Sequence, residues 1–124
     1  MPEQLKWSYS VQAARGPTIA GNGILEVDAY LKLNVAVPAA GSLDVEVLPD
    51  GGGSVQLLVI NPAKPSGELT YLVGADKVPL DGPHVLIGAG AVSLLAGTIG
   101  TLQFENAGAE EAEISILAGR DATP

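Results

Sequence analysis

The chain has no cysteine, and only five of its 124 residues are aromatic: Trp7, Tyr9, Tyr30, Tyr71 and Phe104. Without cysteine the protein cannot form disulfides, zinc–thiolate sites or a thiol nucleophile. The single histidine, His84, excludes a histidine-rich metal site. The few aromatic side chains leave few platforms on which a sugar ring could stack.

Basic residues are also scarce. Six Lys and Arg stand against fourteen Asp and Glu, which gives a net charge of −8. The six are scattered, so they build no basic patch of the kind that binds nucleic acid phosphates. The same charge disfavours an anionic membrane surface. The polar N-terminal stretch lacks a basic segment followed by an apolar run, so we expect no signal peptide and cytoplasmic synthesis.

The long uncharged stretch of residues 85–102 has to be examined as a candidate membrane-spanning helix. Its 18 residues reach the length of a transmembrane helix. Four glycines lower its helix propensity, and acidic flanks without Lys or Arg provide nothing to set an orientation. We therefore do not expect this stretch to cross a membrane, and interpret it as short buried runs separated by glycine, with a strand over 91–95.

The dominant pattern is alternation of apolar and polar residues, which is typical of strands. Residues 5–11 alternate, and residues 25–37 form one long alternating strand that bends midway, with the segment 15–23 between them as a turn connection. Residues 55–60 are apolar at both parities, which indicates a strand covered on both faces. The sequence predicts a single all-β domain over 1–124, an antiparallel sandwich of eight to ten short strands that is either jelly-roll-like or immunoglobulin-like.

One internal similarity suggests a pseudo-repeat. Residues 57–76 can be laid on residues 102–121 with a constant offset of 45, which aligns Asn61 with Asn106 and Leu72 with Leu117. Each copy would be two strands joined by a loop in which Asn satisfies backbone groups. Chance similarity between ordinary strands is the alternative.

No constellation of residues predicts catalysis. The acidic pairs Glu26 with Asp28 and Asp44 with Glu46 are typical of the solvated face of a strand, although glycoside hydrolysis would also need two carboxylates. His84 has no nucleophile motif near it. We predict no catalytic, cofactor-binding or metal-ligating residue, and a protein that is not an enzyme.

Two functional hypotheses remain. The first is a structural protein that assembles with copies of itself, because a two-layer sandwich of this size has little interior for both apolar stretches. The small, glycine-rich, aromatic-poor composition is similar in style to that of virion, decoration or appendage subunits. The candidate interface residues lie in the two apolar stretches: Leu58, Ile60, Val85, Ile87 and Leu94.

The second hypothesis is a ligand-binding module for a glycan, with or without calcium. Its basis is Tyr30, whose parity places it among polar neighbours and therefore toward solvent. The candidate ligand or interface residues are Tyr30, Glu26, Asp28 and Lys32.

Overall fold

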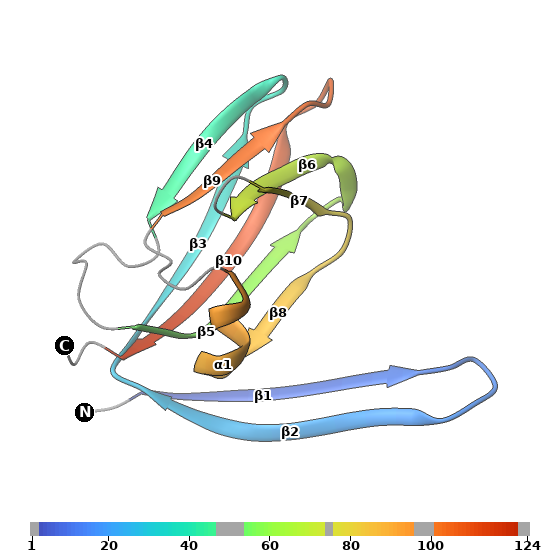
Figure 1. Ribbon diagram of the computed structural model, residues 1–124, viewed down its shortest axis with the longest axis vertical. Coiled ribbons are helices and arrows are strands. Elements are labelled where there is room, and N and C mark those ends of the chain that lie inside the picture. The colour runs from blue at the N-terminus through green and yellow to red at the C-terminus, as the bar shows by residue number, and fades with distance from the viewer. Residues whose placement is uncertain (1–2, 47–53, 74–75, 96–100, 122–124) are drawn as a thin grey trace.

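The computed structural model describes residues 3–46, 54–73, 76–95 and 101–121, and these form an all-β protein (Figure 1). The strands are β1 (Glu3–Gln12), β2 (Thr18–Val27), β3 (Ala29–Val37), β4 (Gly41–Glu46), β5 (Ser54–Pro62), β6 (Ser66–Val73), β7 (Asp76–Leu80), β8 (His84–Ile87), β9 (Thr101–Asn106) and β10 (Ala112–Asp121). A single-turn helix α1 (Ala89–Val92) and a 3₁₀ turn η1 (Ser93–Leu95) follow β8. The predicted antiparallel β-sandwich is confirmed.

The strands β3 to β10 form two four-stranded antiparallel sheets. One has the order β3-β10-β5-β8, and the other has the order β4-β9-β6-β7. The strands pair as β3·β10, β4·β9, β5·β8 and β6·β7. In the sequence, the two strands of each pair lie between the two strands of the pair before it. This is one long hairpin rolled into two sheets, which is the connectivity of a jelly roll. Strand pairing thus selects one of the two predicted topologies.

The core lies between these two sheets and is built mostly from aliphatic side chains. Tyr71 and Phe104 are its two buried aromatic residues, with ring centroids 6.0 Å apart. From the sheet of β3, the inward-facing positions include Val37, Leu58, Ile60, Ile114, Ile116 and Ala118. Successive residues of a strand point to opposite faces, so Leu57, Val59 and Leu117 face outward.

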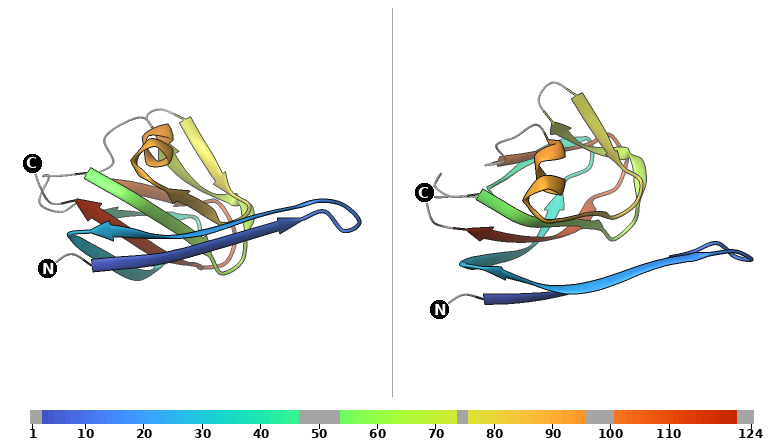
Figure 2. Two further views of the ribbon diagram at one scale, coloured as in Figure 1. Left: turned by 90° about the horizontal axis from the view of Figure 1, so that it is seen from below. Right: turned by 60° about the horizontal axis from the view of Figure 1, so that its bottom comes forward.

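The first two strands leave the jelly roll and form a separate two-stranded hairpin, which we call the arm (residues 3–27). β1 pairs with β2 over ten residues, and the turn is closed by hydrogen bonds between Ala13 and Pro17 and between Gly16 and Ala13. Figure 1 shows the arm running past the end of the two sheets, and Figure 2 shows it from two further sides. The predicted long strand over 25–37 does bend midway, because Asp28 separates β2 from β3.

The predicted turn over 15–23 is wrong in extent, since β2 already begins at Thr18. Gly21 and Gly23 are not turn residues but partners of aromatic residues in the strand pair, Tyr9 and Trp7 respectively. A Cβ on Gly23 would lie 2.6 Å from Cζ2 of Trp7, and one on Gly21 would lie 2.8 Å from Cε1 of Tyr9. Both positions therefore require glycine, because an aromatic ring lies over each of them.

Trp7 and Tyr9 do not belong to the core, although they lie on the apolar face of an alternating strand. Their rings stack on each other on the arm, with centroids 6.0 Å apart, and Tyr9 is 45% exposed. Their strand alternates as predicted, but its apolar face lies on a hairpin outside the two sheets.

The strand over 55–60 is covered on both faces, as predicted. Leu58 faces the core, whereas Leu57 is buried on the opposite side. There the arm base reaches the sheet: a Cβ on Gly119 would lie 2.6 Å from Cδ1 of Leu5 and 3.2 Å from Cγ1 of Val27. Gly119 thus leaves the space in which the arm base seats on the jelly roll.

The stretch 85–102 divides into β8, α1, η1 and β9, and its residues 96–100 lie outside the described residues. The predicted strand over 91–95 is wrong, because this segment is helical and buries Val92 in the core. No helix in the described part of the chain is long and apolar enough to cross a membrane.

The pseudo-repeat with its offset of 45 residues aligns β6 with β10, where the burial of the aligned residues agrees, but it also aligns Asn61 with Asn106, where burial differs. Leu69 and Tyr71 of β6 are core residues, as are their counterparts Ile114 and Ile116 of β10. Asn61, however, is exposed, whereas Asn106 is buried. The Asn106 Nδ2 donates to the carbonyl oxygens of Val37 (3.3 Å) and Glu110 (2.7 Å), and its Oδ1 accepts from the N–H of Gly108 at 2.9 Å.

Candidate functional site

The arm carries the largest set of exposed apolar side chains in the described part of the chain. Of the seven large hydrophobic residues that are exposed, four belong to it: Tyr9 (45%), Val11 (70%), Ile19 (68%) and Ile24 (58%). The remaining three are Tyr30 (52%), Val85 (50%) and Leu94 (77%).

The arm is amphipathic across its two faces. One face carries the cross-strand pairs Leu5 with Leu25 and Val11 with Ile19, with Trp7 and Tyr9 between them over the two glycines. The other face carries Lys6, Ser8, Ser10 and Gln12 on β1, opposite the polar or small residues and Ile24 of β2. Alternation along both strands produces the two faces, because the register pairs apolar with apolar residues.

Burial of the apolar face decreases from base to tip. Val27 is 2% exposed where it meets Gly119, Leu5 and Trp7 are half-buried, and Val11 and Ile19 near the turn are largely exposed. The apolar face therefore continues well beyond the jelly-roll surface that covers its base. A two-stranded hairpin has marginal stability in water by itself, so this extended arm has an exposed face that another surface could cover.

The outer face of the sheet β3-β10-β5-β8 is apolar near the arm and polar further away. The strand register places Tyr30, Gly119, Leu57 and Ile87 in one row across the sheet, and the arm base seats over Gly119 in this row. The next row is Lys32, Leu117, Val59 and Val85, which we call the second row. Beyond it, Ser115 donates to Oδ1 of Asn34 at 2.9 Å, so polar pairs take over.

The predicted interface residues divide into buried and exposed ones. Leu58 and Ile60 are 0% exposed and belong to the core, so an interface cannot use them. Leu57 and Val59, which alternate with them along β5, face outward instead, because one face of β5 packs on the core and the other is the outer face of the sheet. Val85 and Leu94 lie on the surface, and Ile87 is half-buried on β8 beside Leu57.

The four predicted ligand residues are all exposed, but they do not form one continuous face. Glu26 precedes Val27 on β2, and neighbouring residues of a strand point to opposite faces. Since Val27 faces the sheet, Glu26 lies on the arm face that points away from it. Tyr30 and Lys32 lie on the outer face of β3, beyond the bend at Asp28. Because of this bend, alternation counted along one straight strand does not place Glu26 on the same face as Tyr30 and Lys32. Sequence reasoning also missed Val11, Ile19 and Ile24, although the alternation and the turn chemistry around residues 13–17 are a signal for an exposed hairpin.

His84 has a structural partner. Its Nδ1 lies 2.8 Å from the hydroxyl of Tyr71, and the two rings pack edge to face. β8 and β6 belong to different sheets, so this hydrogen bond links the two layers at one side of the sandwich. Burial raises the pKa of the Tyr71 hydroxyl above its ordinary value.

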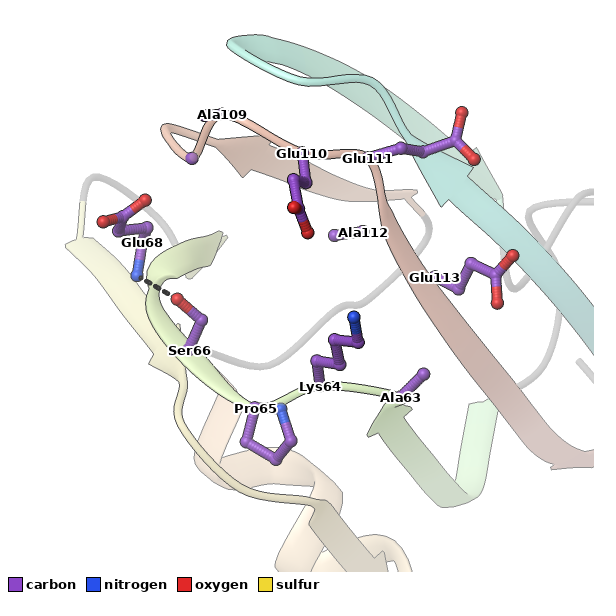
Figure 3. Close-up of a pocket in the computed structure, with 11 residues that line it drawn as sticks. Ala63, Lys64, Pro65, Ser66, Glu68, Ala109, Glu110, Glu111, Ala112 and Glu113 are labelled. Atoms are coloured by element: carbon purple, nitrogen blue, oxygen red, sulfur yellow. Dashed lines mark hydrogen bonds between the residues drawn. The ribbon is translucent and has the colours of Figure 1, made fainter.

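A cleft of about 630 Å³ lies between the β5–β6 and β9–β10 connections (Figure 3). Its lining includes Lys64 and the acidic residues Glu68, Glu110, Glu111 and Glu113. Figure 3 shows Lys64 and Glu110 pointing into the cleft, whereas Glu111 and Glu113 point away. Among the described residues, no three His, Cys, Asp or Glu side chains are grouped to hold a metal ion.

None of the protein-family models matches the chain, and no curated protein sequence matches it either.

Proposed function

We propose that this protein is a non-enzymatic structural subunit that assembles with copies of itself through exposed apolar surfaces. The observation that carries the proposal is the arm, whose apolar face is buried at the base and largely exposed at Val11 and Ile19, which are 70% and 68% exposed. Contiguous exposed apolar surface on a folded domain commonly marks an interface. The jelly roll alone does not decide the function, because viral capsid subunits and lectins both use it.

Assembly of the complete chain is the direct test. Multi-angle light scattering at micromolar concentration is expected to give a mass that is a multiple of 12.5 kDa. A mass of one chain at every concentration up to the millimolar range would refute the proposal.

A glycan-binding module is the second candidate. Tyr30, 52% exposed beside Lys32 on the outer face of the sheet, is the feature that favours it. Binding on a glycan array that Tyr30→Ala abolishes and Tyr30→Phe retains would support this candidate. Repeating the array with calcium and with EDTA tests whether calcium assists.

A further inference from the structure

We propose that the arm is a hinged strap with one seat on its own jelly roll, and that it turns about Asp28 as an intact hairpin when it leaves this seat. The seat is the contact in which Leu5 and Val27 of the arm base lie over Gly119, beside Leu57. The inference goes beyond the proposed function and does not depend on self-assembly, because every contact in it lies within one chain.

The seat is small and separate from the main core. Val27 and Leu57 are 2% and 3% exposed, yet neither belongs to the core cluster between the two sheets. They meet on the outer face of the sheet β3-β10-β5-β8, so the sheet itself lies between the seat and the core. A contact of so few side chains can open while the core stays closed, since local opening needs less free energy than global unfolding.

The missing side chain at position 119 is what lets the arm come this close. A Cβ on Gly119 would lie 2.6 Å from Cδ1 of Leu5 and 3.2 Å from Cγ1 of Val27. The strand is also irregular at this point, because the register of β10 with β5 shifts between Gly119 and Arg120, and such a bulge bends a strand locally. Any side chain at position 119 would therefore occupy the space that the arm base fills.

Asp28 is placed to act as the hinge. It is the single residue between the end of β2 at Val27 and the start of β3 at Ala29. Its N–H donates to the carbonyl oxygen of Arg120 at 2.9 Å, which continues the pairing of β3 with β10 and fixes the jelly-roll side of the link. Hinges absorb changes of φ and ψ in a few residues at the ends of elements. A change in the direction of the arm is therefore expected where Val27 joins Asp28.

The contacts that hold the hairpin together lie within the arm. β1 pairs with β2 over ten consecutive positions without a register shift. The rings of Trp7 and Tyr9 stack on each other and lie over two glycines of β2. The hairpin can keep these contacts after it leaves the seat. Its tip is open to solvent, since Val11 and Ile19 are 70% and 68% exposed, and Figure 2 shows it extending past the sheets.

A distance between the arm and the far sheet tests the hinge. The chain has no cysteine, so V11C on the arm and D44C on the exposed face of β4 can carry the only two spin labels. Pulsed electron paramagnetic resonance then gives their distance distribution, and an excess of unlabelled chain restricts it to distances within one molecule. Six residues from Leu5 to Val11 span about 20 Å, so a turn of about 30° at the seat moves the label by about 10 Å.

Three variants in this labelled background separate the seat from general effects of substitution. G119V fills the seat, and we expect the single narrow distribution of the unsubstituted chain to shift or broaden by about 10 Å. G67V is the matched control, because Gly67 also lies in a strand but a Cβ there meets nothing within 4 Å; its distribution should stay unchanged. L5A removes the arm's side of the contact without altering the sheet, and it should broaden the distribution even if G119V fails to fold.

Amide hydrogen exchange shows whether the arm turns or unfolds. We expect the protection of the β1 and β2 amides in G119V to stay within about threefold of the unsubstituted chain. Circular dichroism of each variant establishes that it is folded.

Four results would overturn the proposal. The distribution could stay narrow in L5A and in folded G119V, or already be broad in the unsubstituted chain; in either case the seat does not hold the arm. G67V could change the distance as much as G119V does, so that the effect does not come from the seat. The arm amides could lose their protection together with the distance change, so that the hairpin unfolds instead of turning. A monomeric mass in light scattering would refute self-assembly alone, because these distances are measured within one chain.

Discussion

The close packing of Trp7 on Gly23 leads to a prediction about a single methyl group. In Gly23→Ala the new Cβ would lie 2.6 Å from Cζ2 and 2.9 Å from Cε2 of Trp7. Carbon atoms in contact normally stay about 3.5–4.0 Å apart, so the indole ring must move by about 1 Å. The side chain cannot avoid the methyl group by a small torsional change at its far end, because the nearest atoms belong to its rigid ring.

The magnitude follows from two opposing terms. Overpacking of this kind costs about 1–3 kcal/mol. Replacing glycine in a strand gains about 0.5–1 kcal/mol, because the unfolded chain loses conformational freedom. We therefore expect the arm to lose up to about 2 kcal/mol, which is large for a two-stranded hairpin of marginal stability. The jelly roll should retain its melting temperature within about 2 °C, since its core contains neither residue.

The assay uses the fact that Trp7 is the only tryptophan. In Gly23→Ala its fluorescence emission should shift to longer wavelength, and quenching by acrylamide should increase. Far-UV circular dichroism follows the melting of the sheets in the same samples. Gly90→Ala is the matched control, because a Cβ there meets nothing within 4 Å, and the emission of Trp7 should stay unchanged.

Unchanged Trp7 emission and quenching in Gly23→Ala would refute the reasoning, since the ring would then not lie over this glycine. A large fall in melting temperature together with the fluorescence change would also contradict it, because it would mean that the arm and the jelly roll unfold as one unit.

Three other predictions concern the jelly roll. Asn106→Ala should lower the free energy of unfolding by about 2–4 kcal/mol in urea titrations, because it leaves three backbone groups without their partner; Asn61→Ala, at an exposed position, should cost less than about 0.5 kcal/mol. Burial raises the pKa of Tyr71, so its neutral form stabilises the fold below pH 10 and this contribution is lost as pH rises through the folded-state pKa; Tyr71→Phe should flatten the stability profile above pH 10. Lys77→Met, which removes the exposed 2.9 Å ion pair with Glu105, should change the urea midpoint by the equivalent of less than about 1 kcal/mol. A loss of more than about 2 kcal/mol would contradict that assignment.

Local patterns were enough to predict most of the elements. Alternation identifies β1, β3, β4, β6 and β10, because a strand with one buried face repeats every two residues whatever it pairs with. The apolar run over 55–60 correctly indicates a strand with two covered faces. The core is mostly aliphatic, with Tyr71 and Phe104 as its buried aromatic rings, which is consistent with the five aromatic residues in the sequence.

Which segment covers each face of a strand was decided by the tertiary structure. Alternation gives Trp7 an apolar face but does not say whether a second layer covers it, and here the strand pairs in an arm outside the sandwich. The same limit applies to Asn61 and Asn106, which a constant sequence offset aligns, although one is exposed and the other is buried. Parity is local, whereas burial depends on which distant segment lies opposite.

The chain alone thus determined the strand class, the absence of thiol chemistry and the acidity, since these depend on composition and on neighbours in sequence. Only the folded molecule decided that Leu58 and Ile60 lie inside while Val11 and Ile19 lie outside. One physical reason for the arm is the bend at Asp28, which separates β2 in the hairpin from β3 in the four-stranded sheet. Long-range pairing, β3 with β10 and β1 with β2, selects between these environments.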